Sequence, residues 1–229
     1  GDVNLRIRGL TRAGLVLASK PVDVGLTARL DGTNAAMRAV AVSEGKTIGR
    51  AQARISPIGG AGGLVDRLAR APLFAQLRYN GPADTLWRLT GIELIDISGP
   101  VAIGADARGT LQEPVIRGSL RTERARLESP VIGTVIENFK SNGRFGGSRL
   151  VLDSFSGTTK HGGTIAGRGS FDLASARGFG IDLAIQAEAA QLIDRDDLKA
   201  QVTGPISIKS DGSGGVISGE VRMVTGSFR

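Results

Sequence analysis

Apolar and polar residues alternate along most of this chain, most clearly between residues 179 and 189. The apolar positions there are Phe179, Ile181, Leu183, Ile185, Ala187 and Ala189. A period of two is typical of a β-strand with one apolar face and one face in water. Residues 22–30, 150–152 and 206–208 alternate in the same way. Parallel strands buried on both faces would give continuous apolar runs, so the pattern predicts an all-β fold of antiparallel or meandering sheet.

Helical periodicity is confined to short segments. Residues 64–71 place apolar residues on one helical stripe between the glycine-rich residues 59–63 and Pro72. Residues 82–89 predict another turn or two, and residues 189–198 predict a third short helix. Together these segments cover roughly a tenth of the chain, far below the roughly one third of an average domain.

A recurring motif suggests how the β segments are organised. The sequence GPVAI at Gly99–Ile103 returns as GPISI at Gly204–Ile208, an offset of 105 residues, and a glycine-initiated strand follows each copy. The first copy carries an extra turn at residues 111–114. Chance recurrence in glycine-rich sequence is the alternative explanation. We expect one repeat-built domain over residues 1–229, with a β segment at 1–58, a glycine-rich linker with short helices at 59–92 and a second β segment at 93–229.

The composition argues against an ordinary enzyme. There is no cysteine and a single histidine, His161, so thiolate chemistry and most histidine-based catalysis and metal binding are excluded. The acidic residues 194–197 lack the spacing of a calcium loop and are interpreted as a charged turn. His161 is interpreted as a surface loop residue, and residues 59–63, which lack the ending of a phosphate-binding loop, as a hinge. We expect no catalytic residue, no metal site and no cofactor.

The net charge of +7 is concentrated near the N-terminus. Residues 1–72 carry 11 Lys and Arg against 5 Asp and Glu, whereas residues 73–229 carry 18 against 17. Such an excess can attract nucleic acid or anionic lipid head groups, and a solvated face that only keeps the protein soluble is the alternative. Aromatic residues are too scarce to form the stacking platforms of single-strand binders, so we expect no nucleic-acid partner.

The apolar face of the predicted sheet must be covered by a second sheet, by a partner or by lipid. Apolar residues make up 41% of the chain but aromatic residues only 4%, and an aliphatic surface suits flexible acyl chains. The expected groove is lined by Val101, Ile103, Leu150, Leu152, Phe171, Leu173, Ile181, Leu183, Ile185, Ile206 and Ile208. Ordinary core is the alternative, because strand parity does not say whether a face is sealed. Arg67 and Arg70 are candidates for binding a lipid phosphate at the groove edge.

No run of residues approaches the ~20 apolar residues of a membrane-spanning helix. The chain starts with neither Met nor the layout of a signal peptide, and it begins and ends within strand-like sequence. We therefore expect it to be a fragment of a longer protein.

Five short runs, taken in their order along the chain, resemble the TamB family of AsmA-like proteins, the translocation and assembly module of Gram-negative bacteria. They are LRYNGPADTLW (77–87), DISGPVAI (96–103), PVIRGSL (114–120), FGGSRL (145–150) and VISGEV (216–221). The resemblance is closest to the C-terminal part of proteobacterial members. It covers residues from about 70 to 229 well, and the first 70 only in general character.

The resemblance implies an elongated, curved sheet folded lengthwise around an apolar interior, the β-taco, with a few short helices. It also implies a parent protein anchored in the inner membrane, with a periplasmic body that carries phospholipid between the inner and outer membranes. Its implied partner is an outer-membrane barrel of the Omp85 type, TamA, which the parent protein meets at its C-terminal end.

Two other functions are compatible with the sequence. One is a scaffold that helps insert outer-membrane proteins, together with TamA, by offering sheet edges to client strands. The other is a carbohydrate-active β-helix enzyme, which would need paired carboxylates facing a cleft, and the spacing of acidic residues does not supply such a pair. Lipid carriage by a non-enzymatic groove is the leading hypothesis.

Overall fold

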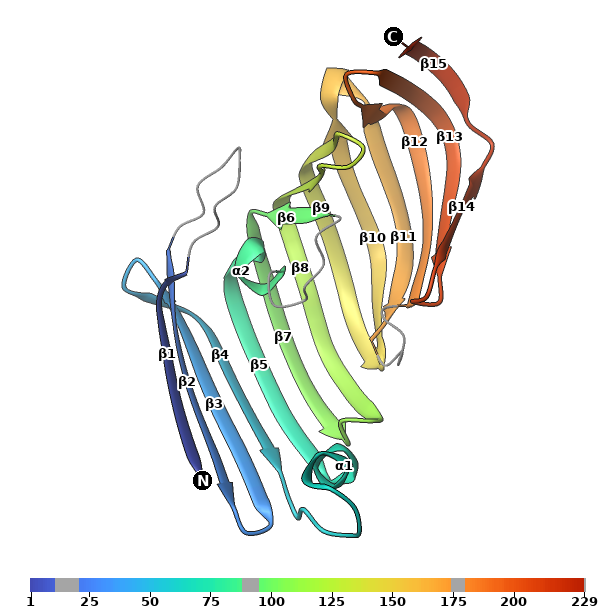
Figure 1. Ribbon diagram of the computed structural model, residues 1–229. Helices are drawn as coiled ribbons and strands as arrows, with labels where there is room; N and C mark the ends of the chain where they lie inside the picture. Colours follow the sequence, from blue (N-terminus) through green and yellow to red (C-terminus); the bar gives the residue numbers. More distant parts are fainter. Residues whose placement is uncertain (11–20, 88–94, 174–179, 229) are drawn as a thin grey trace. The chain divides into compact units, whose positions relative to one another are not determined.

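The computed structural model describes residues 1–10, 21–87, 95–173 and 180–228 and shows an all-β protein (Figure 1). Strands account for 74% of the described residues and helices for 7%, so the predicted fold class is confirmed. The helices are α1 (Leu64–Arg70), α2 (Ala83–Trp87) and the 3₁₀ turn η2 (Lys160–Gly162). None of the helices in the described ranges has the length and hydropathy of a membrane span.

The described structure also contains fifteen strands. The first seven are β1 (Asp2–Leu10), β2 (Val22–Asp31), β3 (Asn34–Ser43), β4 (Lys46–Ile55), β5 (Leu73–Pro82), β6 (Asp96–Ser98) and β7 (Pro100–Gly109). The others are β8 (Pro114–Ser129), β9 (Thr134–Gly147), β10 (Arg149–Thr159), β11 (Thr164–Asp172), β12 (Gly180–Asp194), β13 (Leu198–Ser210), β14 (Gly215–Gly219) and β15 (Arg222–Phe228).

All fifteen strands belong to one antiparallel sheet. The hydrogen-bonded order is β1-β2-β3-β4-β5-β7-β8-β9-β10-β11-β12-β13-β14, with β6 paired to β8 and β15 paired to β13. Nearly every strand therefore lies beside its neighbours in sequence, as tight hairpin connections require. Because one sheet holds every described strand, the described residues provide no second sheet to cover its apolar face.

The chain divides into two compact units, and both β7 and β8 contribute to each of them. Unit 1 consists of Gly1–Pro82, Ala102–Ser119 and Phe145–Ser148. Unit 2 consists of Ala83–Val101, Leu120–Arg144 and Arg149–Arg229. The division into segments that the sequence predicts at 1–58, 59–92 and 93–229 stays a prediction.

In unit 1, the residues whose alternation predicts a strand do form one. The pattern at residues 22–30 becomes β2, which pairs with β3 in unbroken register from Val22 opposite Ser43 to Asp31 opposite Asn34. The predicted first helix is α1, which lies in the connection between β4 and β5 (Figure 1).

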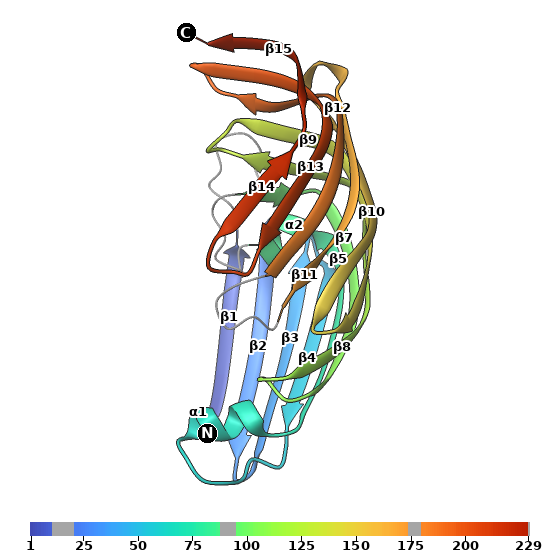
Figure 2. The same ribbon diagram turned by 90° about the vertical axis from the view of Figure 1, so that its right-hand side faces the viewer.

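In unit 2, the strands β12 and β13 curve along their length (Figure 2). The helix expected at residues 189–198 is wrong, because β12 continues to Asp194 and β13 begins at Leu198. Ala189 has a φ of 45°, and the register of β12 against β13 shifts between Ala187 and Ala190. This β-bulge breaks the period of two, which is why the apolar spacing there resembles a helix.

Candidate functional site

The register of β10–β14 gathers apolar side chains into rows that cross the strands. Residues directly opposite each other in an antiparallel pair lie on the same face of the sheet. The first row is Leu150, Phe171 and Ile181; the second is Leu152, Gly169, Leu183, Ile208 and Ile217; the third is Phe155, Gly167, Ile185, Ile206 and Gly219. We call these three rows the apolar face.

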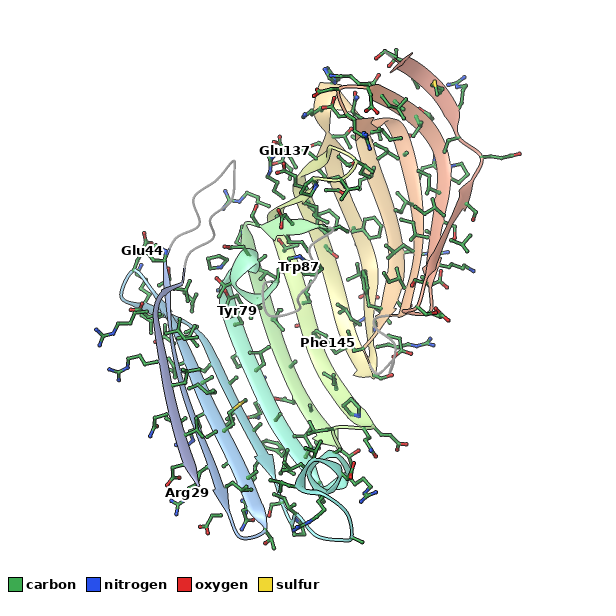
Figure 3. The ribbon with its side chains drawn as sticks, in the orientation of Figure 1. Arg29, Glu44, Tyr79, Trp87, Glu137 and Phe145 are labelled. Carbon is green, nitrogen blue, oxygen red and sulfur yellow. The ribbon has the colours of Figure 1, made fainter. Side chains whose placement is uncertain are left out.

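Burial falls along the apolar face toward the edge of the sheet. In the second row Leu152 is 9% exposed, Leu183 and Ile208 are half-buried, and Ile217 on β14 is 74% exposed. The face therefore stays apolar as far as the edge strand β14, while its side chains become more exposed to solvent. Figure 3 shows the side chains projecting from these strands.

Side chains of the apolar face pack mainly against one another. The rings of Phe139 on β9 and Phe155 on β10 stack with their centroids 5.8 Å apart. The buried centre consists of Leu152, Phe155, Ile165, Ala187, Ala190 and Val202. Partly buried side chains surround it: Ile136, Phe139, Leu150, Phe171, Leu183, Ile185, Leu192 and Ile206. The middle of the face is thus closed by its own packing, and its flanks remain half-exposed.

Glycines allow large side chains to lie across neighbouring strands. A Cβ built on Gly167 would lie 2.5 Å from Cζ of Phe155, and one built on Gly169 would lie 2.5 Å from Cδ2 of Leu183. Both distances are too short for a real Cβ, and the backbone oxygens of Ala184 and Asp182 on β12 lie closer still. Each glycine therefore leaves room both for a neighbouring side chain and for the backbone of β12. The side chains of Phe155 and Leu183 thus cover the two glycines of β11, and the apolar rows continue across this strand.

Most of the predicted lining residues come together in this way. Leu150, Leu152, Phe171, Ile181, Leu183, Ile185, Ile206 and Ile208 all belong to the three rows. Leu173 follows β11 directly and is half-buried. Val101 and Ile103 lie two positions apart on β7, the former 8% exposed and the latter half-buried, and they stand outside the rows of β10–β14.

The sequence reasoning missed several residues of the apolar face and of its buried centre. Phe155 escapes the alternation of β10 because a register shift separates it from Leu152. Ile165 alternates with Gly167 and Gly169, which carry no side chain to mark the face. Ile217 lies on the five-residue strand β14, too short to show a clear period.

Arg67 and Arg70, the candidates for binding a lipid phosphate, donate hydrogen bonds to the loop before α1. Nη2 of Arg67 lies 3.3 Å from the carbonyl oxygen of Ile58, and Nη2 of Arg70 lies 2.8 Å from that of Ala61. Arg67 Nε is buried and has no hydrogen-bond partner among the described residues. Both arginines hold the glycine-rich loop against the helix, and their binding of lipid stays a prediction.

Asp194, in the predicted charged turn, makes ion pairs. Its carboxylate is 10% exposed and lies 2.5 Å from Nζ of Lys160 and 3.0 Å from Nζ of Lys199. Hydrogen bonds from these lysines, Lys160 foremost, hold the pKa of Asp194 below its ordinary value. Asp197 pairs with Arg195 at 2.9 Å.

His161 lies in η2, and its Nδ1 is 3.2 Å from Oε1 of Gln191. Across the described ranges, no group of three or more His, Cys, Asp or Glu residues is placed to hold a metal ion.

Comparison with known proteins identifies one family. No curated protein and no solved structure matches the chain. Residues 153–229 match the family model of the TamB C-terminal domain. The matched segment begins within β10 and includes β11–β15, so it holds most of the apolar face. The last third of the chain is therefore similar to the C-terminal domain of the TamB family.

Proposed function

We propose that this chain is a non-enzymatic, periplasmic part of a TamB-like protein that carries phospholipid between the inner and outer membranes. In this proposal the apolar face shields acyl chains from water while the head group remains outside. The parent protein is anchored in the inner membrane and meets an outer-membrane barrel of the Omp85 type, TamA.

The observation that carries the proposal is the continuity of the apolar face. Its second row crosses five strands, β10 to β14, with no charged residue in it. At a strand spacing of about 4.8 Å the row is roughly 19 Å long, which is comparable with an extended acyl chain. A row running across strands gives an acyl chain a direct path from one strand to the next.

The energetics of such a surface favour sliding. Each buried CH₂ group contributes about 0.8 kcal/mol, so an acyl chain lying on half-exposed aliphatic side chains is held firmly. Non-directional contacts are nearly unchanged when the chain moves by one CH₂ group. A lining of Leu and Ile is therefore suited to holding lipid without fixing its position.

The test places charges on the apolar face. We expect the purified chain to retain phospholipid, detected by native mass spectrometry and by organic extraction. Leu183→Asp combined with Ile185→Lys should lower the bound lipid at least tenfold, because charged groups in the rows must be desolvated when an acyl chain covers them. Circular dichroism establishes whether the variant remains folded.

The matched control uses the same strand and the same two charges. Ala184→Asp combined with Gln186→Lys changes exposed positions on the opposite face of β12 and should leave the bound lipid unchanged. A folded Leu183→Asp, Ile185→Lys protein that still carries lipid would contradict the proposal. Should that variant not fold, a photo-crosslinking residue at Ile208 should capture phospholipid, and the same residue at Ser207 should not.

A second candidate function is a scaffold for outer-membrane protein insertion with TamA. The observation that favours it is the exposed apolar edge at β14, where Val216 is 66% and Ile217 is 74% exposed. Exposed edge strands can pair with a strand of another protein. Ser218→Pro on β14 should then abolish client assembly in cells while bound phospholipid in the purified chain is retained.

A further inference from the structure

The polar face of unit 1 carries three neighbouring arginines, Arg38 on β3 and Arg50 and Arg54 on β4. Arg38 lies opposite Gln52, the residue midway between Arg50 and Arg54. Arg38 is therefore a diagonal neighbour of both, at a Cα distance of roughly 7–8 Å. We call these three residues the arginine cluster.

Two other arginines on this face, Arg29 and Arg78, have acidic partners, whereas the cluster has none. Arg29, labelled in Figure 3, lies 3.6 Å from Asp2 and 3.4 Å from Asp31, and Arg78 lies 2.9 Å from Asp106. Arg38, Arg50 and Arg54 are exposed, and within the described ranges they form no ion pair or side-chain hydrogen bond. Three guanidinium groups thus face solvent with their charge uncompensated.

The next strand carries a further arginine, Arg78, whose charge is compensated by Asp106. Arg50 lies directly opposite Arg78 on β5. Like charges directly opposite each other destabilise a strand pair. Asp106 lowers that cost for Arg78, and an anion over the arginine cluster would lower it for Arg50. The arrangement therefore favours an anionic partner over plain exposure to water.

The surroundings of the cluster are poor in aromatic side chains. Its neighbours on the face include Ala36, which lies opposite Arg54, and Val40, which lies opposite Arg50 and is 40% exposed. The sequences of β1–β4 contain no aromatic residue. Phe74 on β5 has the guanidinium of Arg108 5.9 Å from its ring centroid. Phe74 lies directly opposite Arg54 and is 38% exposed. One ring that already carries an arginine does not make the series of stacking surfaces along which successive bases of single-stranded nucleic acid bind.

We propose that the arginine cluster docks the chain on a bilayer that contains anionic phospholipid. Guanidinium groups bind phosphate through two parallel N–H···O bonds, which a lysine cannot provide. An anionic bilayer offers many phosphates on one flat surface, and its negative potential attracts clustered basic residues. The neighbouring side chains, Ala36, Val40 and Gln52, are shorter than arginine, so the guanidinium groups are free to reach that surface. The proposal uses the polar face of unit 1 and is independent of lipid binding on the apolar face.

The test is co-sedimentation of the full chain with vesicles of phosphatidylcholine alone or of phosphatidylcholine mixed with phosphatidylglycerol. Binding should require phosphatidylglycerol and weaken as salt screens the charges. Arg38→Gln, Arg50→Gln and Arg54→Gln together should weaken it roughly 100-fold at low salt, since each basic residue near an anionic surface contributes about fivefold. The corresponding lysine variant should recover only part of the affinity.

The control removes the same charge from exposed positions elsewhere. Arg124→Gln, Arg149→Gln and Arg168→Gln, at exposed positions of unit 2, should leave vesicle binding within about threefold of the parent chain, since salt screens charges that do not contact the bilayer. Equal loss in both triple variants, or equal binding to both vesicle types, would overturn the proposal. Binding of polyglutamate through the cluster, without binding to either vesicle type, would also overturn the proposal and would indicate an acidic protein partner. Lipid extracted from the cluster variant should match the parent chain, which separates this result from a failure of the apolar face.

Discussion

Single glycines on β11 determine how closely the lining of the apolar face can pack. The ring of Phe155 occupies the space that a side chain at Gly167 would need, and the backbone of β12 lies on the other side. Close-packed interiors tolerate added methyl groups poorly, because neither a ring held by its neighbours nor a paired strand can move aside cheaply.

Gly167→Ala should therefore destabilise the protein. A Cβ there meets Cζ of Phe155 at 2.5 Å, so we expect the free energy of unfolding to fall by about 1–3 kcal/mol. Urea denaturation followed by circular dichroism measures the change. Gly146→Ala is the control, since a Cβ on Gly146 in β9 meets nothing within 4 Å. Equal stability of the two variants would show that neither Phe155 nor the backbone oxygen of Ala184 packs closely against Gly167.

At the scale of elements, Asp194 joins three parts of unit 2. It ends β12, and it binds Lys160 of η2 and Lys199 of β13. The lysines are half-exposed, so water weakens each pair. Asp194→Asn should lower the free energy of unfolding at pH 7 by about 1 kcal/mol. Asp196→Asn, in the exposed turn two residues on, should have little effect.

The same contacts predict a dependence on pH. Because the pKa of Asp194 is lowered in the folded state, its ion pairs stabilise the protein above the pKa of an unfolded aspartate, about 3.9. That stabilisation is lost as the pH falls through the lower, folded-state pKa. Denaturation curves of the parent chain and Asp194→Asn should differ at pH 7 and converge near the acid limit. A difference that persists at the lowest pH would mean that the carboxylate charge is not its origin.

The sequence predicts elements of this fold better than it predicts their neighbours. Alternation alone identifies β2, β12 and the matching parts of β10 and β13, because each has one face away from water. It fails at bulges: the shift between Leu152 and Phe155 hides a lining residue, and the bulge at Ala189 resembles a helix. Register across strands depends on contacts between distant residues, so the rows themselves are visible only in the structure.

For the molecule as a whole, the consequence of a single sheet is a large apolar surface with limited cover. Monomeric proteins rarely leave extended apolar patches in water, and such patches commonly bind a ligand or a partner. Here exposure increases along the second row to Ile217, which is 74% exposed. A ligand that covers this surface should bind the folded protein and not the unfolded chain. Its binding should therefore raise the free energy of unfolding.

A lysophospholipid with a long acyl chain should raise the melting temperature of the chain. Selective binding to the folded state at 100 times the Kd adds about 2.7 kcal/mol, which corresponds to roughly 5–10 °C for a protein of this size. Differential scanning fluorimetry below the micelle concentration measures the shift, and a four-carbon analogue should produce almost none because it buries few CH₂ groups. Leu183→Asp with Ile185→Lys should abolish the shift, whereas Ala184→Asp with Gln186→Lys should retain it. A shift of equal size in both double variants would locate the acyl chain elsewhere than on the apolar face, since the two variants carry the same charges on opposite faces of one strand.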